Sequence, residues 1–231
     1  MDSIHGNFIG NYVYSERGSL GGAIYSSGAL REIVGDFIGN YATGNTKSSF
    51  EAMGGAIYNT RDNQDMKLVE IIAGNFIGNY VEATSSAKGG AIYNDNMIVE
   101  LLGNFIENKA ISVDAIVQGG AIYNDGEINS ITADFSKNAI YTDSAVAYGG
   151  AIFSQGSNIG NIKGNFVKNY ASSGLSHSFG GAIYSYGNNT IDEIIGDFIG
   201  NSVSGGIVAQ GGAIYSFGDS YINNITGDFI G

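Results

Sequence analysis

The chain has 231 residues, a formal net charge of −12, 37 Gly, and no Pro, Cys or Trp. Because only ten residues are basic, the composition argues against nucleic acid or an anionic membrane as a partner, since phosphate binding needs clustered Lys and Arg. The missing Cys excludes disulfides and cysteine metal sites, and no apolar run reaches the ~18 residues of a membrane-spanning helix, so we expect no direct membrane insertion.

Two short motifs alternate along the whole chain. Phe-x-x-Asn starts at Phe8, and Gly-Gly-Ala-Ile follows at Gly21, Gly22, Ala23 and Ile24. The second motif recurs without substitution at intervals of 33, 35, 30, 30, 31 and 31 residues. One supersecondary unit therefore repeats from end to end, which leaves no boundary and predicts a single repeat domain over residues 1–231.

The pieces within each repeat favour short strands over a helix. Each motif Phe has an aliphatic residue seven and four positions before it, as Ile191 and Ile194 precede Phe198. This spacing is also typical of an amphipathic helix. However, Gly or Ala stands two positions before each motif Phe and Gly-Gly heads each copy, so a helix would be shorter than about ten residues. Ile, Tyr, Phe and Val between Gly and Asn bends indicate strands.

A unit of this length cannot bury its own apolar residues, so successive copies must stack as rungs. The sequence predicts an all-β parallel β-helix of about seven rungs, each of ~31 residues. Each motif position then becomes a column: the Phe and aliphatic columns fill the interior, and the Asn column hydrogen-bonds successive rungs at a bend. Besides the first Gly-Gly-Ala-Ile motif, these structural positions are Phe37, Asn40, Phe76, Asn79, Phe105, Asn108, Phe135, Asn138, Phe166, Asn169, Phe198 and Asn201.

Candidate positions for metal binding or catalysis are few. Asp precedes the motif Phe at Asp36, Asp134 and Asp197, but Asn takes this place in other copies, and the spacing of calcium-binding β-rolls is absent. We therefore expect no metal and no cofactor. The only histidines are His5 and His177, and Lys and Arg are dispersed singly, so no cluster breaks the repeat as a catalytic centre should. We expect a protein that is not an enzyme, with a polysaccharide-degrading β-helix as the catalytic alternative.

Two features indicate a binding surface. An aromatic residue follows each Gly-Gly-Ala-Ile, and strand alternation places it opposite the buried Ile, facing outward. This column, which could stack against sugars or pack under a loop, comprises Tyr25, Tyr58, Tyr93, Tyr123, Phe153, Tyr184 and Tyr215. The segments between each Asn and the next Gly-Gly share no pattern and should stack along one edge, as tolerated loops or as the recognition surface that solenoids usually carry there. They are residues 12–20, 41–53, 80–88, 109–118, 139–148, 170–179 and 202–210.

Gly-Gly-Ala-Ile alternating with Phe-x-x-Asn at constant phase resembles the repeats of the chlamydial polymorphic membrane proteins, over essentially the whole chain. The resemblance implies a right-handed β-helix that an autotransporter barrel displays outside the bacterial outer membrane and that serves adhesion to host cells. It implies a host-cell surface protein or glycan as the partner. The barrel, the signal peptide and the cysteines common in that family are missing from this sequence, so export and anchoring follow by analogy alone.

The chain enters and leaves at the same point of the repeat, at Ile4 and Ile225. This predicts that the sequence is a fragment of a longer surface protein. It also makes head-to-tail self-association through unpaired strand edges geometrically possible. The alternative function is therefore a structural protein that assembles into extracellular filaments.

Overall fold

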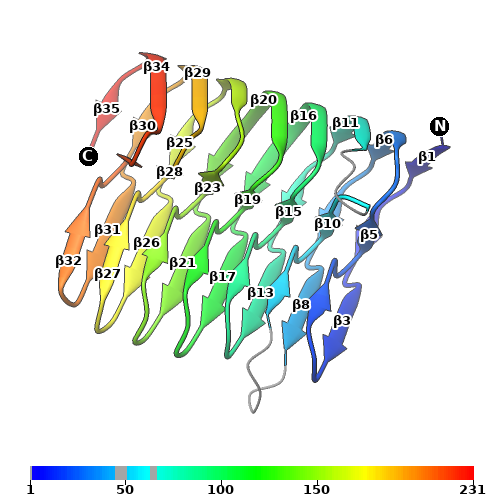
Figure 1. Cartoon of the computed structure of the whole chain (residues 1–231), viewed down its shortest axis with the longest axis horizontal. Helices are drawn as coiled ribbons and strands as arrows, with labels where there is room; N and C mark the ends of the chain where they lie inside the picture. Colours follow the sequence, from blue (N-terminus) through cyan, green and yellow to red (C-terminus); the bar gives the residue numbers. More distant parts are fainter. Residues whose placement is uncertain (1, 45–50, 63–66) are drawn as a thin grey trace.

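The computed structural model describes residues 2–44, 51–62 and 67–231, and this part of the chain contains strands and no helix. The strands pair in parallel and form four sheets that run along the long axis of the molecule (Figure 1). The predicted all-β solenoid of about seven turns, with about 31 residues a turn, is confirmed. The two ends of the chain lie at opposite ends of the stack.

We name the sheets A to D in the order in which the chain enters them. Sheet A carries the aliphatic and Phe columns in register, for example Ile131 beside Ile162 and Phe135 beside Phe166. Its longer strands are β1 (Asp2–His5), β6 (Leu30–Val34), β11 (Leu68–Ala73), β16 (Met97–Ile106), β20 (Glu127–Ser136), β24 (Ile159–Lys163), β29 (Thr190–Ile195) and β34 (Tyr221–Thr226). Its short strands are β2 (Phe8–Ile9), β7 (Phe37–Ile38), β12 (Phe76–Ile77), β25 (Phe166–Val167), β30 (Phe198–Ile199) and β35 (Phe229–Ile230).

Sheets B, C and D have seven strands each. Sheet B consists of β3 (Tyr12–Ser15), β8 (Tyr41–Gly44), β13 (Tyr80–Ala83), β17 (Lys109–Ser112), β21 (Ala139–Thr142), β26 (Tyr170–Ser173) and β31 (Ser202–Gly205). Sheet C consists of β4 (Ser19–Leu20), β9 (Ala52–Met53), β14 (Ala87–Lys88), β18 (Val117–Gln118), β22 (Ala147–Tyr148), β27 (His177–Phe179) and β32 (Val208–Gln210). Sheet D consists of β5 (Ile24–Ser26), β10 (Ile57–Asn59), β15 (Ile92–Asn94), β19 (Ile122–Asn124), β23 (Ile152–Gln155), β28 (Ile183–Tyr186) and β33 (Ile214–Phe217).

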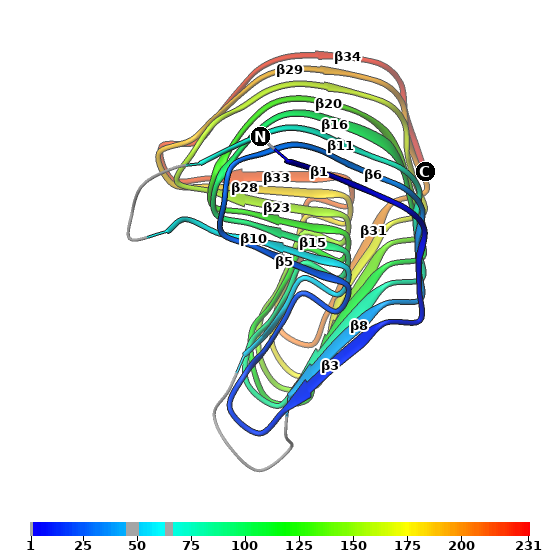
Figure 2. The same cartoon turned by 90° about the vertical axis from the view of Figure 1, so that its right-hand side faces the viewer.

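Each rung has a lobe and an arm in cross-section (Figure 2). Sheets A and D face each other across the lobe, whereas sheets B and C pack together in the narrower arm. The chain passes from sheet A into sheet B after Phe-x-x-Asn and from sheet C into sheet D at Gly-Gly. The two motifs therefore mark the two boundaries between lobe and arm.

The core of the lobe is built from stacked Phe rings and aliphatic side chains. Phe76, Phe105 and Phe135 are fully buried, with centroids 4.7 and 5.0 Å apart along the stack. Leu101 of sheet A and Ile122 of sheet D are also fully buried in this core. Each such side chain contributes roughly 1.5–3 kcal/mol by burial, so every rung adds several large stabilising residues.

The predicted Asn column forms a ladder of hydrogen bonds at the boundary between sheets A and B. The Nδ2 of Asn108 donates to the Oδ1 of Asn138 at 2.9 Å and to the backbone oxygen of Phe76 at 2.8 Å. The Oδ1 of Asn108 accepts from the backbone nitrogen of Asn79 at 3.0 Å. The buried amide thus satisfies the backbone of the corner and links three rungs, as the sequence predicted.

The Asp and Asn residues before each motif Phe form a second ladder, on the outside of the rod. The Oδ1 of Asp134 accepts from the backbone nitrogen of Asn165 at 2.7 Å, and the Oδ1 of Asn165 accepts from that of Asp197 at 2.9 Å. Asp and Asn both offer an oxygen acceptor in this position. This shared chemistry explains why the two residues exchange between copies.

The core of the arm contains mostly small side chains. Ala110, Val117, Ile140, Ala147 and Ala171 are fully buried between sheets B and C. Because Ala and Val bury less apolar surface than Phe and Ile, the arm gains less stabilisation per rung than the lobe.

The Gly-Gly corner needs both of its glycines. Gly119 has a φ of +68°, and a Cβ on it would overlap the carbonyl oxygen of Ile122. A Cβ on Gly120 would overlap the carbonyl oxygen of Gly150 in the next rung. The first glycine therefore permits the left-handed bend and the second permits the close approach of successive rungs.

Candidate functional site

The segments that differ between rungs make up the arm. Each supplies one strand of sheet B, one strand of sheet C and the loop between them, and successive segments pair in register, for example β17 with β21 and β18 with β22. The expected stacking along one edge is confirmed for the described residues; residues 45–50 of the second segment lie outside them. The segments that share no pattern therefore form the arm, beside a lobe whose motifs and buried columns repeat.

Sheets C and D meet at an angle (Figure 2), and side chains on their outer faces pack together and line a pocket; we call this corner between the two outer faces the groove. The sharp Gly-Gly corner turns these two faces toward each other. On the sheet D side lies the aromatic column. On the sheet C side lies the residue before each Gly-Gly, which is Leu20, Met53, Lys88, Gln118, Tyr148, Phe179 or Gln210.

The predicted aromatic column lies on the side of sheet D opposite the buried Ile column, as alternation requires. Its rings stack along the axis, with 4.8 Å between the centroids of Tyr93 and Tyr123. The four central members, Tyr93, Tyr123, Phe153 and Tyr184, are only 2–8% exposed, whereas Tyr25 near the N-terminal end is 57% exposed. Tyr58 and Tyr215 are partly buried. The column therefore does not form a bare outward stripe: it is the floor of the groove.

Among the described residues, side chains of sheet C cover this floor. The Tyr148 ring lies 4.7 Å from that of Tyr184 at 52°, and the Phe179 ring lies 4.8 Å from that of Tyr215. Burial raises the pKa of the Tyr93, Tyr123 and Tyr184 hydroxyls far above the ordinary tyrosine range. These hydroxyls are therefore held neutral, and their rings serve packing.

The groove residues of the second to fourth rungs form a charged half, defined by Glu51, Arg61, Lys88, Asp95 and Asp125. The Nζ of Lys88 lies 3.0 Å from the Oε1 of Glu51, and the Nη2 of Arg61 lies 2.7 Å from the Oδ1 of Asp95. Residues that are dispersed singly in the sequence thus gather here in ion pairs. The pairing compensates most of the charge in this half.

Asp125 is a partly buried carboxyl of the charged half. Burial, and then the neighbouring charge of Asp95, raise the pKa of its carboxyl, while a hydrogen bond from Gln155 opposes the shift. The Nε2 of Gln155 also donates to the hydroxyl of Tyr123 at 2.8 Å. Gln155 thus connects the charged half to the rest of the groove.

The groove residues of the fourth to seventh rungs form an aromatic half, defined by Gln118, Tyr148, Gln155, Phe179, Tyr186 and Phe217. Most of them line a pocket of about 310 Å³, whose side chains are all aromatic or amide. Tyr186 is 42% exposed, and its ring stacks on that of Phe217 at 6.0 Å and 7°. This half offers flat rings and neutral hydrogen-bonding groups together.

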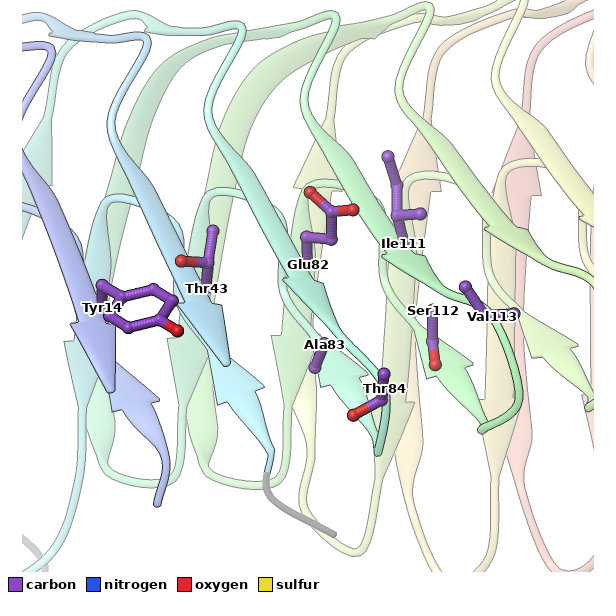
Figure 3. A pocket seen from close by; sticks show the side chains of 8 residues that line it. All are labelled: Tyr14, Thr43, Glu82, Ala83, Thr84, Ile111, Ser112 and Val113. Atoms are coloured by element: carbon purple, nitrogen blue, oxygen red, sulfur yellow. The ribbon is translucent and has the colours of Figure 1, made fainter. Parts of the chain in front are cut away.

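The outer face of sheet B carries a second pocket, of about 250 Å³ (Figure 3). Tyr14, Thr43, Glu82 and Ile111 occupy the same position in four successive strands and form its length. Val113, which is 50% exposed, lies at one end. Since neighbouring rungs place a ring, a hydroxyl, a carboxylate and an aliphatic group here, the arm presents a different surface at each level.

The exposed part of the groove comes from residues that the sequence did not single out. Tyr186 and Phe217 stand two positions after the aromatic column, and Tyr148 and Phe179 stand directly before Gly-Gly. Two signals were available: aromatic residues flank the motif on both sides only in the later copies, and strand alternation puts positions two apart on one face.

The comparisons with known proteins identify no relative: no protein-family profile, curated protein or solved structure matches the chain. Within residues 2–44, 51–62 and 67–231, no three acidic or histidine side chains gather as a metal site would require. Over the same ranges, no helix has the length and hydrophobicity to cross a bilayer.

Proposed function

We propose that the chain is a non-catalytic adhesin of the bacterial cell surface: a β-helix fragment of the passenger region of an autotransporter-like protein, exposed outside the outer membrane. The arm binds a host-cell surface protein or glycan. The observation that carries the proposal is the division of each rung, with the constant motifs in the lobe and the variable segments in the arm. In solenoids, surface that varies on a constant scaffold usually carries recognition.

The arrangement of the charged groups supports binding over catalysis. Of the groove carboxylates, Glu51 and Asp95 are held in ion pairs with Lys88 and Arg61. A glycosidase needs two carboxyl groups that flank a scissile bond and are free to transfer protons. Paired carboxylates at the wall of the groove suit electrostatic positioning of a ligand instead.

A cell-binding assay with matched variants tests the proposal. Purified labelled chain should bind cultured host cells saturably, and Val113→Asp on the arm should weaken binding by about tenfold, because a buried charge is costly at an interface. Ile195→Asp is the control, since Ile195 lies on sheet A of the lobe with 40% exposure against 50% for Val113. Absence of cell binding, or equal loss in both variants, would contradict the adhesin. Release of reducing sugars from polysaccharides would indicate an enzyme.

Head-to-tail assembly into filaments stays a prediction. Electron microscopy of the purified chain separates the two functions, because uniform fibres would favour the filament and short monodisperse rods would favour a passenger fragment.

A further inference from the structure

The aromatic half of the groove has the components of a ligand site. In the charged half, ion pairs between side chains already satisfy Glu51 and Asp95. In the aromatic half, the pocket is lined by uncharged rings and amides from both sheet C and sheet D. A pocket with an apolar surface and a few convergent polar groups is the usual form of a small-ligand or oligomer site.

Tyr186 provides the main stacking surface. It lies in register between Gln155 of the preceding rung and Phe217 of the following rung. A neighbouring rung therefore covers Tyr186 on each side, so the 42% exposure of its side chain faces the groove and not an end of the stack. The parallel rings of Tyr186 and Phe217, with centroids 6.0 Å apart, continue the ring stack along the rod axis.

Tyr148 forms the opposing wall on sheet C. Its ring is tilted by 52° against that of Tyr184 and by 53° against that of Phe153. A flat ligand against Tyr186 would meet a second aromatic surface in Tyr148, which lines the same pocket. Rings on two sides of a groove can contact the apolar faces of a ligand without enclosing it.

Neutral hydrogen-bonding groups line the same pocket. Gln118 from sheet C and Gln155 from sheet D supply amides, and the Tyr148 and Tyr186 side chains supply hydroxyls. The Gln155 amide is oriented by its 2.8 Å bond to the Tyr123 hydroxyl. The pocket therefore offers both donors and acceptors beside its aromatic surfaces.

The local charge excludes anionic ligands. The sequence has no Lys or Arg after Lys168, while the whole chain carries a net charge of −12. Sulfate, phosphate or carboxylate groups would find no basic partner among the residues that line the pocket. The matching ligand is uncharged, has flat apolar faces for the rings, and has a rim of hydroxyls for the amides.

We propose that the aromatic half of the groove binds a neutral glycan chain, with a sugar ring stacked on Tyr186 and Phe217 and its hydroxyls bound by Gln118 and Gln155. The proposal rests on the adhesin function proposed above and names the chemical class of its ligand. Because the residues that line the pocket come from successive rungs, from Gln118 to Phe217, the glycan lies lengthwise and crosses several rungs.

Calorimetric titration of the full 231-residue chain tests this inference. The probes are the neutral polysaccharides laminarin, mannan and xylan, with heparin and polygalacturonate as anionic controls. At least one neutral probe should bind, and the anionic ones should not. Tyr186→Ala should weaken that binding by about tenfold, the size expected for loss of one stacked ring, whereas Tyr186→Phe should retain it.

The matched control is Tyr141→Ala, because Tyr141 is 40% exposed on sheet B and lies outside the groove. It should leave glycan binding unchanged. No binding of any neutral probe, stronger binding of heparin, or equal affinity in Tyr186→Ala would overturn the inference. Cell binding by a chain that binds no neutral glycan would also overturn the inference, but it would leave the adhesin proposal intact. Glycan binding without cell binding would overturn only the adhesin proposal.

Discussion

The lobe and the arm are stacked from the same rungs, yet they differ in what fills them. The lobe buries Phe and Ile side chains whose neighbours in the next rung are the same residue, as with Phe105 and Phe135. The arm buries Ala, Val and other smaller residues, such as Ala110 and Val117. The comparison shows that the lobe can supply most of the stabilising burial in each rung, while the outward-facing residues of the arm differ from rung to rung.

Truncation of one side chain in each region should show the largest difference. Phe105→Ala should lower the free energy of unfolding by about 3–5 kcal/mol, because it removes a fully buried ring from the stack. Ala110→Gly, also fully buried but in the arm, should cost about 1–2 kcal/mol. Urea unfolding followed by circular dichroism measures both. Equal losses would show that the arm stabilises the rod as much as the lobe.

The Asn ladder should rank second. Asn108→Ala leaves two buried backbone groups of the preceding rung, the nitrogen of Asn79 and the oxygen of Phe76, without a partner, so we expect a loss of about 1–3 kcal/mol per unsatisfied group. The arm control is Ser112→Ala, which removes a 2.8 Å bond to the backbone oxygen of Ser85 and a 3.2 Å bond from the backbone nitrogen of Ala115, both only partly buried, and should cost about 1–2 kcal/mol in total. The same unfolding assay applies, and a larger loss for Ser112→Ala would reverse the ranking.

The buried tyrosines at the junction of lobe and arm predict alkaline sensitivity. Burial raises the folded-state pKa of Tyr123 above its unfolded value, so its contribution is fully present below about pH 10 and is lost as pH rises further. Each such tyrosine should then lower the free energy of unfolding by at most about 1.4 kcal/mol per pH unit. Tyr123→Phe should flatten the alkaline part of a stability-against-pH curve. Phe153→Tyr should steepen it; parallel curves for all three proteins would contradict the prediction.

The smallest effect concerns the corner that leads from lobe to arm. Lys168 has a φ of +55°, where the first, second, third and seventh rungs have Gly10, Gly39, Gly78 and Gly200. Lys168→Gly should therefore stabilise the protein by up to about 1 kcal/mol, since it relieves a left-handed conformation at a non-glycine residue. The reverse change, Gly200→Lys, should destabilise it by a similar amount. Thermal unfolding measures both, and shifts of the same sign would refute this reading of the corner.

The sequence was sufficient to predict the lobe because its side chains act only along their own columns. Phe105 packs on the Phe of each neighbouring rung, and Asn108 bonds the Asn of each neighbouring rung. A repeat therefore contains its own contacts, and spacing alone identifies them. The parallel stacking and the inward columns followed from that.

The groove could not be predicted, because it depends on contacts between different columns. Alternation showed that Tyr123 points away from the Ile column, but not that the Gly-Gly corner turns sheet C against it. The approach of Tyr148 on sheet C to Tyr184 on sheet D arises from this turn. The direction of a bend depends on backbone dihedral angles, and Gly adopts positive and negative φ about equally readily, so the presence of Gly-Gly does not predict the direction.

The parallel pairing of the rungs has a mechanical consequence. The backbone hydrogen bonds that join rungs follow the long axis, and the two ends of the chain lie at opposite ends of that axis. Tension between the ends would load the bonds of one terminal rung at a time, since each rung touches only its neighbours. The rod should thus lengthen in steps, each releasing about 31 residues, or roughly 100 Å of extended chain.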